Sequence, residues 1–294
     1  MSSRSQRSAS VVPKPDPPSF AELLEEVVHK PGVISHAYFH FHSYSMLNQL
    51  LAFFECKRRV IQPGPIHTFK GWLALNRHVR KGEKGITLCM PISWKERRDS
   101  DQPPAEHVED QKSVITPAII RRRFIYRANW FVLAQTDGEP LPDSSVPQWN
   151  ESLALNTLSI ERIPFDLMNG NAQGFARGNQ VSVSPIAYLP LRTLMHEIAH
   201  VLLGHTAEGA SMIDQNERTP RDVREVEAEA VAYIVTQSLN MPGEEFSRGY
   251  LQHWLQNGQI EERSAQKIFH AADVLLKAGR PANTEGTETI DSAD

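Results

Sequence analysis

Hydrophobic spacing predicts helices near both ends of this chain. Residues 20–28 repeat apolar side chains at helical intervals, and residues 43–59 do so more strongly. Residues 190–205 and 221–235 show the same periodicity. The segment 190–205 also has a proline near its start and a glycine near its end, which is typical of a short buried helix.

A second pattern, with a period of two, predicts strands in the middle of the chain. Residues 86–94 alternate apolar with shorter or polar side chains, and residues 119–136 form a second candidate strand. We expect these two strands to pair antiparallel across the acidic, proline-containing insertion 99–112. Residues 159–165 and 180–184 are shorter candidates. Together with the helices, these strands predict an α+β fold.

Changes in composition divide the chain into two domains. Residues 1–19 are polar and carry too little apolar surface to fold, so a disordered tail is predicted there. Residues 140–150 contain three prolines and are interpreted as a linker. It separates an N-terminal domain of mixed helices and antiparallel strands, residues 20–139, from a C-terminal domain, residues 151–278. Residues 279–294 are expected to form a second disordered tail.

Composition favours a cytoplasmic protein. Of the 294 residues, 40% are hydrophobic and 22% are charged, as in soluble globular proteins. No run of about 18 apolar residues could span a membrane, and the N-terminus lacks the apolar core of a secretory signal. The two cysteines, Cys56 and Cys89, are too few for a disulfide framework and fit a reducing compartment.

The distribution of charge suggests a nucleic-acid partner for the N-terminal domain. Residues 1–150 contain 20 Lys and Arg against 15 Asp and Glu, whereas the remainder contains 11 against 20. Within residues 57–98 the ratio is 11 to 2. Basic groups interleaved with aromatic rings suit single-stranded DNA, since cations contact phosphates and rings stack on unpaired bases. A solvated basic face is the alternative, and most of these rings could belong to the core: Tyr44, Trp72, Phe124, Tyr126 and Trp130.

The helix predicted at residues 190–205 carries the motif HExxH. His196 and His200 are four residues apart, so they share a helix face and can reach one metal ion. Glu197 is then the candidate general base of a metal-dependent hydrolase. The motif also arises by chance, but three ionisable groups on one face of a buried helix are costly unless something pairs them. We therefore favour a metal site.

A catalytic zinc site usually has three protein ligands. The metzincin pattern is excluded, since it would need glycine and histidine where the chain has Leu203 and Thr206. Glu225 and Glu229 share a face of the next helix, whereas Glu227 points elsewhere. One of the pair could bind the metal while the other orients a histidine. Glu229 is preferred because it lies deeper among alanines, but the spacing in related zincins would select Glu225, so both stay candidates.

Three further features could complete a peptidase site. His205 and Tyr233 are candidates to stabilise an oxyanion, although His205 could equally be a cation at the helix end. Residues 180–184 precede the metal helix and are expected to lie along the cleft edge, where an extended peptide could add as a strand.

Several short segments of the N-terminal half form a recognisable set. They are Tyr44-Ser45 with Asn48, Trp72, the run Arg77-His78-Val79-Arg80-Lys81-Gly82-Glu83-Lys84-Gly85-Ile86, and Gln135-Thr136-Asp137-Gly138. Together they resemble the N-terminal DNA-binding domain of the ArdC antirestriction proteins. The C-terminal half is similar to the zincin-like metallopeptidase domain joined to it there. The likeness covers roughly residues 20–275.

The resemblance implies an antirestriction protein that binds single-stranded DNA and protects incoming plasmid DNA during conjugation. It implies a gluzincin-like metallopeptidase site with Zn²⁺, or another divalent metal such as Mn²⁺. The protein target could be a component of the host restriction system or a DNA-bound protein. The implied DNA contacts are Trp72, Arg77, Arg80, Lys81 and Lys84, to which Tyr44 and Lys70 are added. Two alternatives stay open, a regulatory metallopeptidase that cleaves a repressor or DNA-bound protein, and a binding module with a structural metal.

Overall fold

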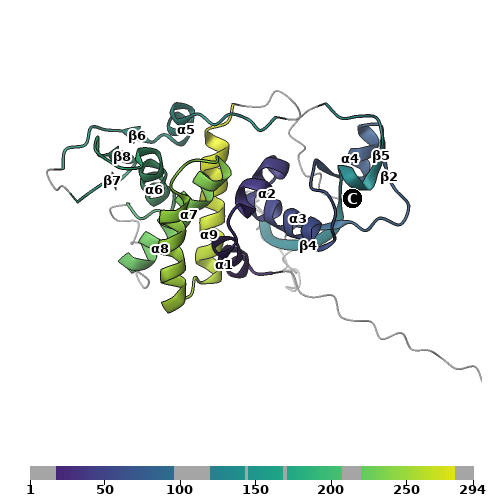
Figure 1. The fold of residues 1–294 in the computed structure, drawn as a ribbon, viewed down its shortest axis with the longest axis horizontal. Helices are drawn as coiled ribbons and strands as arrows, with labels where there is room; N and C mark the ends of the chain where they lie inside the picture. Colours follow the sequence, from purple (N-terminus) through teal and green to yellow (C-terminus); the bar gives the residue numbers. More distant parts are fainter. Residues whose placement is uncertain (1–17, 96–119, 143–144, 168–170, 207–219, 282–294) are drawn as a thin grey trace, which may run out of the picture.

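Three helices begin the N-terminal domain. The computed structural model describes residues 18–95, 120–142, 145–167, 171–206 and 220–281 (Figure 1). Its first helices are α1 (Phe20–His29), α2 (Val33–Phe41) and α3 (Met46–Arg58). The predictions for residues 20–28 and 43–59 are confirmed as α1 and α3. The pattern analysis missed α2, because apolar residues occupy both of its faces, as the 63% exposure of Phe39 indicates.

A three-stranded antiparallel sheet follows these helices. Strands β3 (Ile86–Lys95) and β4 (Ile120–Val132) pair as predicted, with Met90 opposite Ile125. Strand β1 (Ile66–Thr68) pairs with the other edge of β4, which gives the order β1-β4-β3. The predicted insertion 99–112 lies outside the described residues. The sheet packs against α3, so the strands and the helices share one core.

The chain leaves this sheet earlier than predicted. β4 ends at Val132, because a 3-10 turn (Leu133–Gln135) redirects the chain. The segment Thr136–Gly138 then forms β5, which pairs with β2 (Arg77–Val79) in a separate two-stranded ladder. The short helix α4 (Phe69–Ala74) packs on β2 and also contacts β1 and β4. This small unit carries the basic turn that follows β2.

The C-terminal half is mainly helical. Its largest helix, α7, packs against α6, α8 and α9 and is buried along most of its length. The predicted helix at residues 221–235 is confirmed as part of α7, and the helix predicted at 190–205 is α6, which ends three residues earlier. The helices are α5 (Glu151–Leu158), α6 (Pro190–Leu202), α7 (Arg221–Ser238), α8 (Glu244–Asn257) and α9 (Glu262–Ala278).

A small sheet packs against α6. It consists of β6 (Glu161–Arg162), β8 (Gln180–Val183) and β7 (Gly174–Arg177) in the order β6-β8-β7. β8 pairs parallel with β6 and antiparallel with β7. The expectation that residues 180–184 form the edge is therefore wrong: β8 is central in the described sheet, and β6 and β7 are its two edge strands. β7 was missed because Gly- and Asn-rich flanks read as turns.

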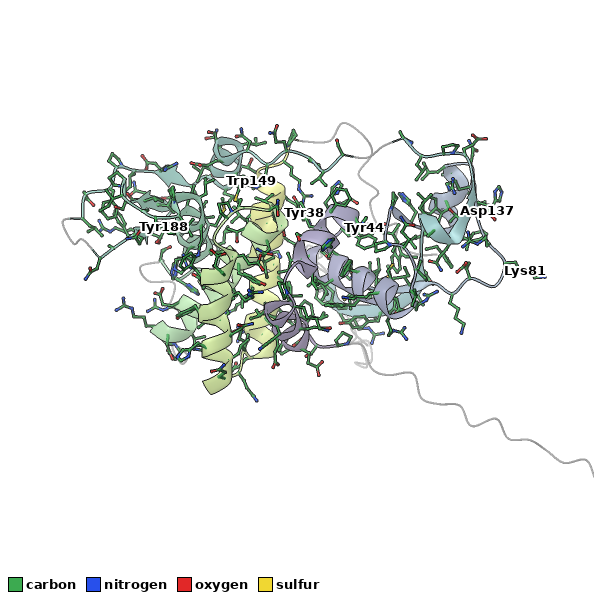
Figure 2. The ribbon with its side chains drawn as sticks, in the orientation of Figure 1. Tyr38, Tyr44, Lys81, Asp137, Trp149 and Tyr188 are labelled. Atoms are coloured by element: carbon green, nitrogen blue, oxygen red, sulfur yellow. The ribbon has the colours of Figure 1, made fainter. Side chains whose placement is uncertain are left out.

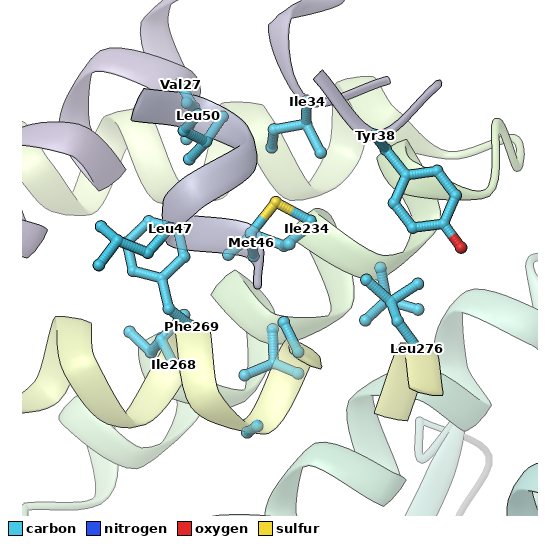
Figure 3. Close-up of a cluster of buried hydrophobic side chains, with 14 of the residues drawn as sticks. Val27, Ile34, Tyr38, Met46, Leu47, Leu50, Ile234, Ile268, Phe269 and Leu276 are labelled. Atoms are coloured by element: carbon cyan, nitrogen blue, oxygen red, sulfur yellow. The ribbon is translucent and has the colours of Figure 1, made fainter. Parts of the chain in front are cut away.

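The helices of the two halves share one hydrophobic core. α1 packs against α8 and α9, and α2 packs against α7. Figure 3 shows side chains of α1, α2 and α3, such as Val27, Ile34 and Leu50, in one cluster with Ile234 of α7 and Phe269 of α9. The predicted α+β fold with two domains is confirmed, but the domains are joined by this core as well as by the chain.

Polar contacts reinforce this junction and reach into the predicted C-terminal tail. Asp273 on α9 accepts a hydrogen bond from the backbone nitrogen of Met46 at 2.6 Å, and thereby caps α3. Gly279 accepts one from the backbone of Asn150 at 2.8 Å. Arg280 donates to the Tyr38 hydroxyl at 3.1 Å. The first residues of the predicted tail 279–294 are therefore part of the fold.

The two candidate functional regions lie far apart along the molecule. Lys81, in the basic turn, is at one end of the long axis, whereas α6 and α7 lie toward the other (Figures 1 and 2). Among the helices that the structure describes, none combines the length and the apolar character needed to cross a membrane.

Candidate metal centre and nucleic-acid interface

The histidines of the HExxH motif face one another on α6. Pro190 occupies the first turn of this helix, where its missing N–H is not needed, and Leu194, Met195 and Ile198 anchor the opposite face in the core. The Nε2 atoms of His196 and His200 lie 3.1 Å apart. Two imidazole nitrogens are thus directed at one point.

Glu225 on α7 completes a triangle of potential ligand atoms. Its Oε2 lies 3.5 Å from His196 Nε2 and 3.6 Å from His200 Nε2. In a tetrahedral site with bonds of about 2.0–2.1 Å, neighbouring ligand atoms are about 3.3 Å apart. The three separations are close to this value, and imidazole nitrogen with carboxylate oxygen is a donor set that suits Zn²⁺ and Mn²⁺. The residues present therefore fit a divalent cation.

Glu229 is not a member of this triangle, so the preference for it as the third ligand is corrected. It lies one helical turn beyond Glu225, where its Oε2 is 3.1 Å from the other ring nitrogen of His196, Nδ1. Its Oε1 pairs with Arg192, which is held by Ser247 at 2.8 Å. Burial raises the pKa of Glu229, but His196 and Arg192 outweigh it and hold the pKa at about 2. Glu229 is placed to orient His196.

His205 returns to His200 from beyond the end of α6. Gly204 has a φ of 74°, a left-handed conformation that favours glycine, and the backbone nitrogen of His205 donates to the His200 carbonyl at 2.9 Å. The Nδ1 atoms of His200 and His205 are 3.0 Å apart. His205 Nε2 lies 2.9 Å from Glu227 Oε2 on α7. His205 is thus neither a free helix-end cation nor directed toward an oxyanion, and both predictions for it are wrong.

Electrostatics favour a neutral His205 beside an ionised Glu227. Burial lowers the pKa of His205, and the nearby His200 lowers it further, against the opposing effect of Glu227. Burial raises the pKa of Glu227, but hydrogen bonds from His205 and Ser264 outweigh this and lower it overall. As predicted, Glu227 points away from the Glu225 face of α7.

Glu197 is buried between α6 and the edge strand β7. Its side chain is close to Gly174, where an added Cβ would lie 2.7 Å from Glu197 Oε1. Burial raises the pKa of Glu197 to about 7, even though the nearby His196 lowers it. A carboxylate with a pKa near neutrality can accept and return a proton in one reaction.

Negative charge accumulates around His196. Burial lowers the pKa of this histidine, but Glu225 and Glu229 raise it to about 9. The contact with His196 in turn lowers the pKa of Glu225 well below its usual range. A divalent cation between the ligand atoms would balance the same carboxylate charge.

Tyr233 does not reach this centre. It is 1% exposed on α7, and its hydroxyl donates to the Val27 carbonyl of α1 at 3.2 Å. It therefore joins α7 to α1, and its assignment as an oxyanion candidate is corrected.

Two of the predicted DNA contacts are structural residues. Trp72 is fully buried, and its indole nitrogen donates to the Phe131 carbonyl at 2.7 Å. Arg77 is 8% exposed, and its guanidinium binds Thr136 Oγ1 at 2.9 Å and the carbonyls of Gly138 and Glu139. Both assignments are corrected: Trp72 joins α4 to β4, and Arg77 joins β2 to β5. The hydroxyl of Tyr44 donates to the Ile66 carbonyl at 2.7 Å, so this ring is also held within the fold.

The remaining predicted contacts form an exposed basic surface. Lys70 lies on α4, and Lys81 and Lys84 belong to the turn after β2. Arg80 is half-exposed, but it pairs with Glu83 at 3.0 Å and with the Ala134 carbonyl, which ties the turn to the end of β4. We call the exposed side chains of Lys70, Arg80, Lys81 and Lys84 the basic surface.

Each half of the chain is similar to a known protein domain. The N-terminal domain of anti-restriction factor ArdC matches residues 27–122, and the IrrE N-terminal-like domain of the peptidase M78 type matches residues 160–267. The chain combines an ArdC N-terminal domain with an IrrE-like M78 domain. The resemblance inferred from the sequence motifs is thereby confirmed.

Individual relatives of this ArdC-like chain are distant. The metal-free crystal structure of the antirestriction protein ArdC from plasmid R388 is 16% identical, with a TM-score of 0.50 over 88% of this chain and 94% of that one. Its Mn(II)-bound structure is 18% identical, with a TM-score of 0.48 over 90% and 99%. The uncharacterized protein y4eC of Sinorhizobium fredii is 25% identical over 215 residues, 70% of this chain. The match spans 66% of that relative's length.

Proposed function

We propose that this ArdC-like chain is an antirestriction protein that binds single-stranded DNA and carries a metal-dependent peptidase site. The observation that carries the peptidase assignment is the triangle of His196 Nε2, His200 Nε2 and Glu225 Oε2 beside the buried Glu197. Zn²⁺ is the cation that we expect, with Mn²⁺ as the alternative, because both accept this mixed nitrogen and oxygen donor set.

The residues around the triangle have separable roles in peptide hydrolysis. A divalent cation held there would polarise the scissile carbonyl and acidify water at the site. Glu197 would accept the proton from that water and pass it to the leaving amine, which its raised pKa of about 7 allows. Glu229, backed by Arg192, would keep the His196 ring in its ligating orientation.

In the part of the chain that the structure describes, the edge of β7 away from β8 has no strand paired to it, and it offers a place for the substrate. β7 pairs with β8 on one side, and Gly174 brings its backbone next to Glu197. An extended peptide could add to the other side of β7 by backbone hydrogen bonds, which would lay its carbonyls past Glu197. A side chain at position 174 would collide with Glu197, so glycine keeps this approach open. The substrate class that we propose is therefore an extended polypeptide segment.

The basic surface is the proposed contact for single-stranded DNA. Lys81 is exposed in a turn at one end of the molecule (Figure 2), and Lys84, three residues further along the chain, is also exposed. Lys70 lies on the neighbouring α4, and Phe69 beside it is 51% exposed, so a ring is available for stacking in place of the buried Trp72. Cations and exposed rings are the groups that bind unpaired strands.

We expect Lys81→Ala plus Lys84→Ala to weaken binding of single-stranded DNA and to flatten its salt dependence. Loss of two phosphate contacts should make the negative slope of log K against log salt shallower by about 1.4. Fluorescence anisotropy with a labelled oligonucleotide over a range of salt concentrations measures both. The matched control is Lys30→Ala plus Lys277→Ala, which removes the same charge from exposed sites directly after α1 and on α9. Equal affinity and slope in the test variant and the wild-type chain would contradict the assignment.

Protection of incoming plasmid DNA is a function that would use both the basic surface and the peptidase site. Conjugation delivers a single strand, which the basic surface would bind, while the peptidase site would act on a component of the restriction system or another DNA-bound protein. The alternative is a regulatory peptidase that uses DNA only for recruitment. A Glu197 variant that keeps DNA affinity but loses every biological effect would favour that alternative.

A further inference from the structure

The second ligand histidine has its own orienting chain, which contains a third histidine. His196 is oriented directly by the carboxylate of Glu229. On His200, the corresponding nitrogen Nδ1 faces His205 Nδ1 at 3.0 Å, and His205 Nε2 faces Glu227 Oε2 at 2.9 Å. A line of hydrogen bonds therefore runs from Glu227 on α7 through His205 to His200.

With a neutral His205 and a carboxylate at its end, this line of hydrogen bonds is satisfied by one arrangement of protons. A carboxylate accepts hydrogen bonds and donates none, so His205 carries its proton on Nε2. Its Nδ1 is then an acceptor and takes the proton that His200 carries on Nδ1. The lone pair of His200 is left on Nε2, the atom that lies 3.1 Å from His196 Nε2 and 3.6 Å from Glu225 Oε2.

We propose that Glu227 and His205 are positioning residues that hold His200 in the tautomer and ring orientation required for metal binding. This inference rests on the proposed metal site and adds two residues that supply no ligand atom themselves: His205 acts through its contact with His200, and Glu227 acts through His205. The local structure supports the role: Gly204, in the left-handed region, turns the chain so that His205 returns beneath His200.

Burial explains why this relay would matter. The side chains of His205 and Glu227 are 7% and 3% exposed, so water has little access to replace a lost partner. Without His205, His200 Nδ1 would lose its acceptor, and the ring could rotate or carry its proton on Nε2. Partners of this kind typically change metal affinity by about 10- to 100-fold.

The test is Zn²⁺ affinity of the full chain, measured by competition with a chromophoric chelator. We expect His205→Ala to weaken Zn²⁺ binding by about 10- to 100-fold. His205→Asn should restore most of the affinity, because the asparagine side-chain oxygen can stand where Nδ1 accepts. The matched control is His29→Ala on α1, whose ring contacts the carbonyl of Glu25, and it should bind as the wild-type chain does.

A second readout separates positioning from general stability. The visible absorption of the Co²⁺-loaded chain reports ligand geometry, and we expect it to change in His205→Ala and to be restored in His205→Asn. Wild-type affinity and an unchanged Co²⁺ spectrum in folded His205→Ala would overturn the relay and leave the metal site standing. Absence of Zn²⁺ binding by the wild-type chain would overturn both the metal site and the relay.

Discussion

Glu197→Gln is expected to reduce peptide hydrolysis by about 100- to 10,000-fold, the range typical of a general acid or base. Glutamine keeps the size of the side chain but cannot accept a proton. Among the described residues, the neighbouring carboxylates offer no second base in this position, since Glu225 belongs to the ligand triangle and Glu229 is paired with Arg192. The measurement is cleavage of a mixed peptide library by the Zn²⁺- or Mn²⁺-loaded chain, followed by mass spectrometry.

Metal and DNA binding are the controls for this variant. Glu197 is outside the triangle, so Glu197→Gln should bind the divalent cation and single-stranded DNA as the wild-type chain does. A variant that cleaves peptides at the wild-type rate would contradict the role of Glu197. Protection of DNA that persists in this variant would show that DNA binding alone is the protective act, and the metal would then be structural.

Trp72→Ala is expected to destabilise the chain by about 3–5 kcal/mol, the usual cost of removing a large buried aromatic side chain. Trp72 is fully buried, and its ring packs edge-on against that of His67, with the ring centroids 4.8 Å apart. Its indole N–H donates a hydrogen bond to the Phe131 carbonyl. Trp72 therefore joins α4 to β1 and β4. Chemical denaturation measures the free energy of unfolding.

The neighbouring Phe69 provides the matched control. It lies on the same short helix but is 51% exposed, so Phe69→Ala should change the free energy of unfolding by at most about 0.5 kcal/mol. If Phe69 stacks on a base, the same variant should lose DNA affinity. Wild-type stability in Trp72→Ala together with lost DNA affinity would contradict the assignment of Trp72 as a structural residue and of Phe69 as the ring that stacks on DNA.

The pattern of apolar residues located the helices of the candidate metal centre and the two main strands of the N-terminal domain, but it left other elements unpredicted, among them α5, α8 and α9. Helical periodicity predicted α1, α3, α6 and α7, and alternation predicted β3, β4 and their pairing. It failed for α2, whose apolar side chains lie on both faces, and for β7, whose four residues carry almost no alternation. It could not show that α1 and α2 pack on α7 and α9, because packing between distant segments leaves no local period.

The site was predictable wherever spacing alone determines geometry. A separation of four residues placed His196 and His200 together, and placed Glu225 and Glu229 on one face of α7. Spacing could not choose between these glutamates, because the choice depends on how far α7 is shifted along α6. The basic residues were identified from the composition of the segment and from the family resemblance, but burial decided which of them face solvent, and Arg77 is held by the carbonyls of the last residue of β5 and the residue after it.

The HExxH motif did not predict the residues that orient its histidines, of which His205 is one. Gly204 directly after α6 was a signal for a left-handed turn, and the return of His205 to the preceding helical turn follows from that geometry. Arg192 and Glu227 had no comparable signal, since their roles come from contacts between α6, α7 and α8.

The direct test of the metal centre is calorimetric titration of the full chain with Zn²⁺ and Mn²⁺, compared with Glu225→Gln and Glu229→Gln. We predict one divalent cation per wild-type chain, loss of binding by more than about 100-fold in Glu225→Gln, and a smaller loss of about 10- to 100-fold in Glu229→Gln. Binding by Glu225→Gln at wild-type affinity, or no binding by the wild-type chain, would contradict the assignment of His196, His200 and Glu225 as the metal site.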